Sequence, residues 1–341
     1  MTPTHAPILV TGGAGYIGSH TVRLLAGQGR QIVVLDNLVF GHDQAIVDAG
    51  VELVVGEVGD QALVRGLFAK YRFGAVIHFA AFAYVGESVT NPLKYYQNNT
   101  AEPIKLLQVM QEFGCQVLVF SSTCATYGVP DCLPITEANT QNPINPYGRS
   151  KLMVEWILAD CGHAWGLRSA CLRYFNASGC SADGRIGEDH RPETHLIPRV
   201  MMAVTGEIDC LEVFGTDYAT PDGTCIRDYI HVEDLAVAHA RALDHLVEGG
   251  QSVRCNLGTG VGVSVKEIIT AVEEVTGQSV PVKFGPRRAG DPDSLVADPS
   301  LAKQLLGWEA THKDVRDMVR PAWLWSHGPN HGRFPENTRS A

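Results

Sequence analysis

Short apolar runs alternate with helix-like segments over the first half of the chain. Each run is rich in Val, Ile, Leu or Phe, and strands that are buried on both faces read in this continuous way. The runs occupy residues 7–12, 32–37, 52–57, 75–80, 117–122 and 168–175. Because strands that alternate with helices form parallel sheets, the pattern predicts an α/β fold with a doubly wound, Rossmann-like parallel sheet.

The pattern changes after about residue 180. Residues 179–195 are polar and Gly-rich, and the later apolar segments are shorter and less regular. We therefore expect a Rossmann domain over 1–180, a smaller α/β lobe over 181–325 and a flexible tail over 326–341. One strand near 225–232 is expected to return to the main sheet, so that the two lobes interleave.

Composition and charge narrow the classes of function. With 341 residues, of which 45% are hydrophobic, the chain can bury a large core, and its formal net charge of −10 argues against non-specific binding to nucleic acid or to a membrane. The nine cysteines contain no C-x-x-C pair, so they suggest neither a zinc site nor a disulfide framework, and no metal is expected. We find no signal peptide and no apolar run of membrane-spanning length, which favours a cytoplasmic location.

Glycines follow the first predicted strand in the segment ILVTGGAGYIGSH. Gly12, Gly15 and Gly18 can form the tight turn at which a helix N-terminus meets a pyrophosphate. Asp36 ends the second predicted strand, where a carboxylate can accept hydrogen bonds from both ribose hydroxyls of an adenosine. The carboxylate would repel a 2′-phosphate, and DNLVFGH offers no Arg or Lys beside it. The pattern thus favours NAD over NADP.

A tyrosine and a lysine lie one helical turn apart in NPYGRSK. Asn145 can cap a helix there and Pro146 suits its first turn, which places Tyr147 and Lys151 on one face. Most such pairs are ordinary solvated side chains, but this one follows FSSTCATYG, whose Thr123 is expected at the carboxyl end of a strand. Since a nearby ammonium favours a phenolate, Tyr147 could serve as the general base for an alcohol whose hydride passes to NAD.

Together with further motifs, these segments resemble the UDP-sugar 4-epimerases of the extended short-chain dehydrogenase/reductase family. The resemblance runs from about Ile8 to Trp325 and includes LDNL, HFAA, VGES, YYQNN, LRYFNASG, GTDYATPDGTCIRDYIHVEDLA and PRRAGD. It implies an isomerase that interconverts UDP-glucose and UDP-galactose by NAD-dependent oxidation at C4, rotation of the 4-keto sugar and re-reduction. A UDP-arabinose/UDP-xylose 4-epimerase and a non-catalytic NAD-binding Rossmann protein are the alternatives.

The resemblance also implies roles for individual residues. The implied catalytic residues are Thr123, Tyr147 and Lys151. Those implied to bind the cofactor are Gly12, Gly15, Tyr16, Ile17, Gly18, Asp36, Asn37, Glu57, Val58, Phe79, Ala80, Asn98, Ser121, Tyr147, Lys151 and Tyr174. Those implied to bind the UDP-sugar are Thr123, Asn176, His195, Leu196, Phe214, Arg227, Arg288, Asp291 and Leu295.

The roles of the two arginines and of Leu295 have a physical basis as well, and the resemblance also predicts how the chain assembles. Arg227 and Arg288 can supply the guanidinium groups that a diphosphate needs in an acidic protein. Leu295, intermediate in size, is expected to limit the C2 substituent of the sugar and to favour non-acetylated UDP-sugars. The segments 92–113 and 147–165 have apolar faces that resemble the dimerising helices of the family, so a homodimer is expected.

Overall fold

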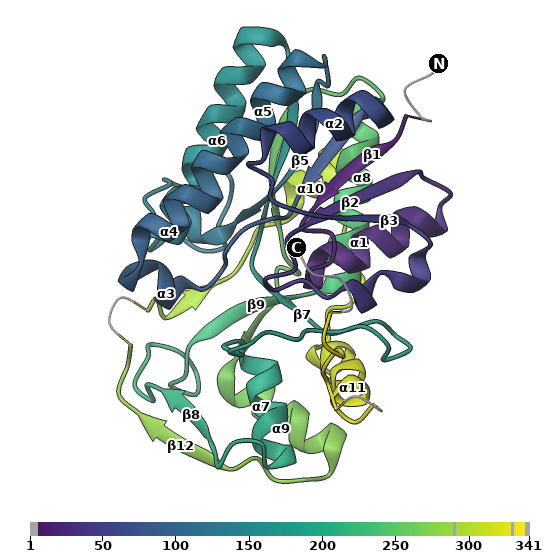
Figure 1. Ribbon diagram of the computed structural model, residues 1–341. Helices are drawn as coiled ribbons and strands as arrows, with labels where there is room; N and C mark the ends of the chain where they lie inside the picture. Colours follow the sequence, from purple (N-terminus) through teal and green to yellow (C-terminus); the bar gives the residue numbers. More distant parts are fainter. Residues whose placement is uncertain (1–5, 289–290, 329–330, 338–341) are drawn as a thin grey trace.

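The computed structural model describes residues 6–288, 291–328 and 331–337 (Figure 1). Its larger lobe is built on a sheet of seven strands in the order β10-β6-β5-β4-β1-β2-β3, and every pairing within this sheet is parallel. The strands are β1 (Ile8–Thr11), β2 (Ile32–Asp36), β3 (Glu52–Val55), β4 (Ala75–His78), β5 (Val117–Thr123), β6 (Arg168–Tyr174) and β10 (Val253–Leu257). The predicted Rossmann-like parallel sheet is confirmed.

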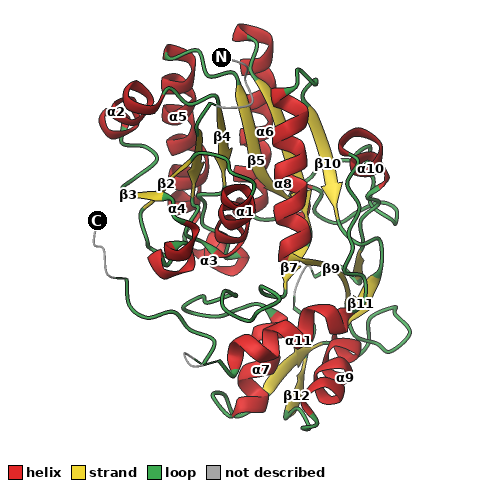
Figure 2. Cartoon of the chain, turned by 90° about the vertical axis from the view of Figure 1, so that its right-hand side faces the viewer, coloured by secondary structure: helices red, strands yellow, loops and turns green. Residues whose placement is uncertain are grey.

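Helices cover both faces of this sheet (Figure 2). One apolar layer lies beneath α1 (Tyr16–Gly27), α8 (Val232–Val247) and α10 (Ser300–Leu306). The other lies beneath α2 (Gln61–Tyr71), α5 (Glu102–Glu112) and α6 (Pro146–Trp165). Because apolar side chains leave water on both faces, the central strands β1, β2, β4 and β5 are buried along their whole length, whereas the edge strand β3 is partly exposed.

Short helical segments connect the larger elements. They are η2 (Asp43–Ala45), η3 (Val47–Ala49), α3 (Val85–Thr90), α4 (Pro92–Tyr96), the π-helical turn η4 (Gln97–Ala101) and η5 (Cys124–Thr126). The predicted start of α6 is confirmed, since the Asn145 side chain accepts a hydrogen bond from the Gly148 backbone N–H at 2.8 Å and Pro146 occupies the first turn.

The smaller lobe lies below the carboxyl ends of the main strands (Figure 1). Its four-stranded sheet comprises β7 (Asn176–Ser178), β9 (Ile226–His231), β11 (Gly262–Ser264) and β13 (Ser294–Leu295). A second pair consists of β8 (Leu211–Phe214) and β12 (Val282–Gly285). The apolar core of this lobe is covered by α7 (Leu196–Thr205), α9 (Val265–Thr276) and α11 (Val315–Ser326).

The expectation that residues 225–232 return to the main sheet is wrong. This segment contains β9, which pairs with β7, β11 and β13 in the smaller lobe, and β10 is the strand that joins the main sheet beside β6. In this position the buried carboxylate of Asp228 on β9 accepts hydrogen bonds from the backbone N–H groups of Thr259, Gly260 and Ala297. These bonds help to hold β9 in the smaller lobe.

The described residues at the C-terminal end contact the rest of the molecule. Phe334 is buried and its ring stacks on that of His42, with 5.0 Å between the ring centroids. The Asn337 side chain accepts a hydrogen bond from the Asp43 backbone N–H and donates one to the Gly41 carbonyl. Residues 329–330 and 338–341 of the expected tail over 326–341 lie outside the described ranges. Among the described helices, none combines the length and apolar composition of a membrane span.

Candidate active site

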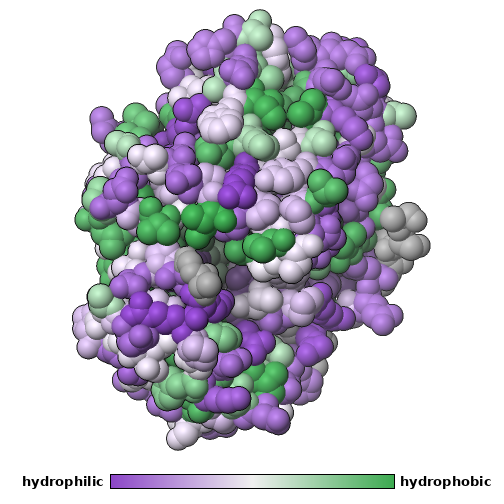
Figure 3. All heavy atoms as spheres, turned by 90° about the vertical axis from the view of Figure 1, so that its left-hand side faces the viewer, coloured by the Kyte–Doolittle hydropathy of each residue, from purple (hydrophilic) through white to green (hydrophobic). Residues whose placement is uncertain are grey.

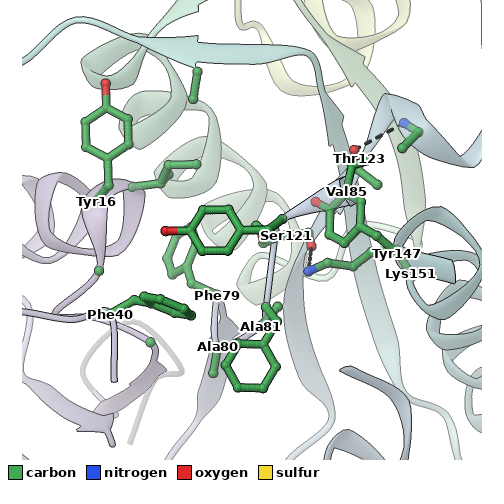
Figure 4. Close-up of a pocket in the computed structure, with 18 of the residues that line it drawn as sticks. Tyr16, Phe40, Phe79, Ala80, Ala81, Val85, Ser121, Thr123, Tyr147 and Lys151 are labelled. Carbon is green, nitrogen blue, oxygen red and sulfur yellow. Dashed lines mark hydrogen bonds between the residues drawn. The ribbon is translucent and has the colours of Figure 1, made fainter. Parts of the chain in front are cut away.

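A cavity of about 650 Å³ follows the carboxyl ends of the main strands and extends to the smaller lobe. Figure 4 shows one part of it, with Tyr16 and Phe40 on one side and Tyr147 and Lys151 on the other. Every residue implied to bind the cofactor lines this cavity. Of the residues implied to bind the UDP-sugar, Thr123, Asn176, His195, Arg288, Asp291 and Leu295 also line it, whereas Leu196, Phe214 and Arg227 do not.

The glycine turn between β1 and α1 leaves room for a ligand at the helix N-terminus. Gly12 has a φ of +69°, and a Cβ there would lie 2.5 Å from the backbone nitrogen of Ala80. At Gly18 a Cβ would lie 2.2 Å from the carbonyl oxygen of Gly12. Gly15 caps α1 without a side-chain hydrogen bond, so the first backbone N–H groups of the helix point towards the cavity edge, where they can bind a phosphate.

Asp36 lies at the end of the cavity that the sequence assigns to adenosine. Its two carboxylate oxygens accept hydrogen bonds from the backbone N–H groups of Ala14 at 3.0 Å and Leu38 at 2.9 Å. Burial raises the pKa of this carboxyl group, and the two hydrogen bonds oppose the rise. Beside it, Asn37 donates to the Glu57 carboxylate at 3.2 Å. The glycine turn and this acidic end together fit a dinucleotide without a 2′-phosphate.

Three polar side chains meet where β5 faces α6. Lys151 is buried, and its Nζ donates to the Ser121 carbonyl oxygen at 2.8 Å (Figure 4). Thr123 ends β5, and its Oγ1 accepts a hydrogen bond from the Ala125 backbone N–H at 3.1 Å. Tyr147, in the first turn of α6, is hydrogen-bonded to the Thr123 side chain. Strand and helix ends thus bring a hydroxyl, a phenol and an amine to one wall of the cavity.

The electrostatics of this wall differ from the simple expectation that Lys151 lowers the pKa of Tyr147. Burial raises the pKa of the Tyr147 phenol, the neighbouring Tyr174 adds to the rise, and the hydrogen bond with Thr123 opposes it. Burial also lowers the pKa of Lys151 to about 7. An amine that is only half protonated near neutral pH offers its neighbour less positive charge than a fully charged ammonium would.

A network of charged and aromatic side chains lies at the substrate end. Asp291 forms an ion pair with Arg227 and accepts a hydrogen bond from the Tyr218 hydroxyl at 3.3 Å. The Arg288 guanidinium lies 4.7 Å from the ring centroid of Phe214, and its Nε is 3.9 Å from Asp291. Arg227 and Phe214 do not line the cavity themselves, but each contacts a residue that does. Arg227 pairs with Asp291, and Phe214 lies against Arg288.

Other implied substrate residues flank this network. Leu295 of β13 lies opposite Arg227 of β9 in the strand register. His195 lies next to the cavity, and Leu196 is the first residue of α7. The motif PRRAGD includes residues 289–290, which lie outside the described ranges.

Several lining residues were not predicted. Phe40 packs edge-to-face against Phe82 and Tyr84, with ring centroids 5.7 and 5.2 Å apart. Glu188 and His190 line the cavity near His195. The aromatic residues occur in DNLVFGH and AFAYVGES, two segments already noted for other reasons, but nothing in the sequence alone indicates that they meet.

Known proteins with similar sequences or structures cover almost the whole chain. The UDP-glucose 4-epimerase of Halalkalibacterium halodurans is 50% identical over 330 residues, which are 97% of this chain and 98% of the relative. That of Rhizobium meliloti is 50% identical over 325 residues, covering 95% and 98% of the two chains. Both proteins extend well beyond the Rossmann half, so the similarity includes the smaller lobe.

Solved structures agree with this result. The UDP-glucose 4-epimerase from Brucella ovis in complex with NAD superposes with a TM-score of 0.91 at 55% identity, covering 93% of this chain and 97% of that one. The enzyme from Bifidobacterium longum in complex with NAD+ and UDP has a TM-score of 0.90 at 39% identity, covering 96% and 100%. The family model described as "NAD dependent epimerase/dehydratase family" matches residues 8–258. The resemblance read from the sequence motifs is confirmed, and the chain belongs to the NAD dependent epimerase/dehydratase family.

Proposed function

We propose that the chain is an NAD-dependent isomerase that interconverts UDP-glucose and UDP-galactose. The observation that carries the proposal is one continuous cavity that runs from Asp36 past Tyr147 and Lys151 to Arg288 and Leu295. It accommodates a dinucleotide at one end and a charged ligand at the other, with an acid–base pair between them. The curated relatives, which are similar along nearly the whole chain, are named for the same reaction.

NAD, when bound, accepts a hydride from the sugar carbon and returns it, so no net oxidation takes place. Tyr147 removes the proton of the C4 hydroxyl and later restores it. Thr123 hydrogen-bonds Tyr147 and helps to orient the reacting hydroxyl. Because burial disfavours a lone phenolate and a lone ammonium alike, Tyr147 and Lys151 are best stabilised when they are charged together, and Lys151 thus supports the basic form of Tyr147.

The substrate is held mainly through its UDP part. Arg288 provides charge-assisted hydrogen bonds for the diphosphate at the cavity, with Asn176 and Asp291 beside it. Arg227 and Phe214 support this end of the site through their contacts with Asp291 and Arg288. His195 and Leu196 complete the proposed contacts at the start of α7. Strong binding of UDP allows weak binding of the sugar, and the 4-keto sugar needs this freedom to turn over and present its other face.

Leu295 sets the space in which the sugar turns. It lines the cavity and packs against the small cluster of Tyr127, Ile135, Phe175 and Ala297. A bulky C2 acetamido group must clear this side chain during the rotation, and overpacking by a methylene or two costs about 1 to 3 kcal/mol. Non-acetylated UDP-sugars are therefore the preferred substrates.

The experiment that tests the proposal is a substrate panel. Purified protein is incubated with UDP-glucose, UDP-galactose, UDP-xylose or UDP-N-acetylglucosamine, and the products are followed to equilibrium. The expected result is the fastest turnover for the two hexoses and slower turnover for the N-acetylated sugar. Faster turnover of UDP-xylose would favour the pentose alternative, and a protein that binds NAD but converts none of the four sugars would be the non-catalytic alternative.

We also infer a homodimer in a reducing compartment, most simply the cytoplasm. The side of the molecule that carries α3, α4 and α6 bears exposed hydrophobic side chains (Figure 3). They are Val89, Leu93, Ile104, Met153 and Trp156. An apolar surface of this kind is typical of a subunit interface. All nine cysteines are free thiols, as in cytosolic proteins.

A further inference from the structure

Four potential ligand side chains converge in the loop between β7 and α7. They belong to Glu188, His190, Glu193 and His195, which follow the pattern E-x-H-x-x-E-x-H. One ligand atom from each side chain lies within 4.8 Å of all the others.

The ligand atoms lie at the distances of hydrogen bonds and ion pairs from one another. The Nδ1 atoms of His190 and His195 lie 3.1 and 2.7 Å from the same oxygen of Glu188. Glu193 contributes one oxygen at 3.0 Å from the His195 Nδ1 and the other at 3.8 Å from the His190 Nδ1. A small volume is thus surrounded by two imidazole nitrogens and two carboxylates.

The two carboxylates take their positive charge from the imidazoles of His190 and His195, which pair with them when protonated. A divalent ion would replace the protons on these imidazoles. The side chains of Glu188 and Glu193 are only 6% and 8% exposed, and burying two carboxylates close together is costly unless positive charge compensates them. The nearby Arg191 pairs with Asp189, and Arg199 donates to the backbone carbonyl of Glu193. Within the described residues, no Lys or Arg forms an ion pair with either carboxylate. One divalent ion would neutralise both.

A buried hydroxyl beside the cluster has no hydrogen-bond partner. Within the described ranges, the Oη of Tyr84 is buried and has no hydrogen-bond partner. Its ring meets that of His190 edge-to-face, with 6.0 Å between the centroids. A buried hydroxyl is stable only when it is hydrogen-bonded, and a water bound to a metal ion would supply that bond.

We propose that Glu188, His190, Glu193 and His195 bind one divalent transition-metal ion, with Zn²⁺ as the representative case. Imidazole nitrogen and carboxylate oxygen are the donors that Zn²⁺ takes when no thiolate is present. By binding four side chains of one loop, the ion holds this loop in one conformation and keeps His195 and the start of α7 beside the cavity. Its role is structural, so the site can exist whether or not the chain catalyses the proposed epimerisation.

A second group of possible ligands provides an internal comparison. His231, Glu233 and His312 also lie close together, but they contain one carboxylate only. The Nδ1 of His231 accepts a hydrogen bond from the Glu233 backbone N–H, and its ring stacks on that of His312 at 4.2 Å. Because this second group offers a single carboxylate, we place the metal in the first cluster.

The test is direct metal binding by the tag-free chain after treatment with a chelator. Isothermal titration with Zn²⁺ near neutral pH is expected to give one ion per chain. Glu188→Gln and His195→Gln should each weaken binding by at least about tenfold. His312→Gln removes a ligand of the second cluster, and His163→Gln removes an exposed histidine on α6; both should leave the affinity unchanged.

Two further measurements distinguish loss of the metal site from poor folding of a variant. Co²⁺ bound in place of Zn²⁺ should give visible absorption bands in the wild-type chain and lose them in folded Glu188→Gln. Zn²⁺ should also raise the melting temperature of the wild type but not of that variant. Absence of stoichiometric binding would overturn the proposal, as would binding that persists in Glu188→Gln and His195→Gln or is lost only in His312→Gln. None of these measurements depends on epimerase activity.

Discussion

At the scale of single residues, the phenol of Tyr147 is the group on which the proposed chemistry depends. Tyr147→Phe removes the base but keeps the ring that fills this part of the cavity. Turnover should fall by about 100-fold or more, because general base catalysis is lost, while the fold remains intact. Steady-state kinetics and circular dichroism measure the two effects. Tyr71→Phe, which changes a surface tyrosine that bonds Glu52, is the control, and near-normal activity of folded Tyr147→Phe would remove this assignment.

Because the pKa of Lys151 is lowered by burial, we expect this residue to make the free energy of unfolding depend on pH. Burial lowers its pKa from 10.5 to about 7, so between these values the unfolded chain binds a proton that the folded chain does not. The stability contributed by this group must therefore rise with pH across that window. The free energy of unfolding of the cofactor-free wild type, minus that of Lys151→Met, should increase by about 2 kcal/mol from about pH 7 to about pH 9.

Urea unfolding at several pH values measures this difference. Subtracting the variant cancels the cysteines and tyrosines that titrate in the same range, since both proteins share them. A difference that is flat or falls with pH would mean that Lys151 keeps an ordinary pKa in the fold.

Arg288 and Arg287 are neighbours with different expected roles. Arg288 lies over Phe214 at the cavity, whereas Arg287 pairs with Asp217 and Asp293. Arg288→Ala should weaken UDP binding by about 1.5 to 3 kcal/mol, because the diphosphate loses a charge-assisted hydrogen bond. Arg287→Ala, with the same change of charge, should have little effect. Titration calorimetry with UDP compares them, and equal losses in both variants would indicate a general charge effect only.

At the scale of elements, a buried ion pair anchors α6 to the sheet. The Glu155 carboxylate accepts hydrogen bonds from Arg173 on β6 at 2.6 and 3.0 Å and from the Ser122 hydroxyl on β5 at 2.6 Å. Arg173 also donates to the Tyr127 hydroxyl at 2.8 Å. Because α6 carries Tyr147 and Lys151, this network holds the helix that positions the proposed base.

Removing one partner of the pair leaves the other charge buried without compensation. Arg173→Met should therefore lower the free energy of unfolding by about 3 to 5 kcal/mol. The double variant Glu155→Leu with Arg173→Met should lose less than Arg173→Met alone, since neither charge remains. Chemical denaturation of the three proteins decides this point. A double variant that loses more stability than the single one would show that the hydrogen bonds of Glu155 to β5 matter more than its charge.

At the scale of the whole molecule, the exposed apolar side of the Rossmann lobe predicts a dimer. Trp156 on α6 and Leu324 on α11 are each 56% exposed, but they belong to different lobes. Trp156→Glu places a charge in the proposed interface and should convert the dimer to monomers, whereas Leu324→Glu should not. Sedimentation velocity gives the mass of each protein. A wild type that is monomeric at micromolar concentration, or a dimer that survives Trp156→Glu, would rule out this interface.

The sequence by itself determined six strands of the main sheet and the local features of the site. Six apolar runs correspond to β1 to β6, and the residues around Asn145 and Pro146 start α6 as expected. These features are local, since strand burial, helix capping and glycine turns depend on near neighbours in the chain. The family could be recognised for the same reason, because its motifs are short continuous segments.

Only the tertiary structure decided which distant segments meet. It paired β10, rather than β9, with β6, and it satisfied the buried Asp228 of β9 with backbone donors distant in the sequence. It buried Lys151 deeply enough to lower its pKa, an effect that helical spacing does not reveal. It also brought Glu188 and His195 together by folding one loop on itself. Burial and long-range contacts set desolvation and charge, and neither can be read from local sequence.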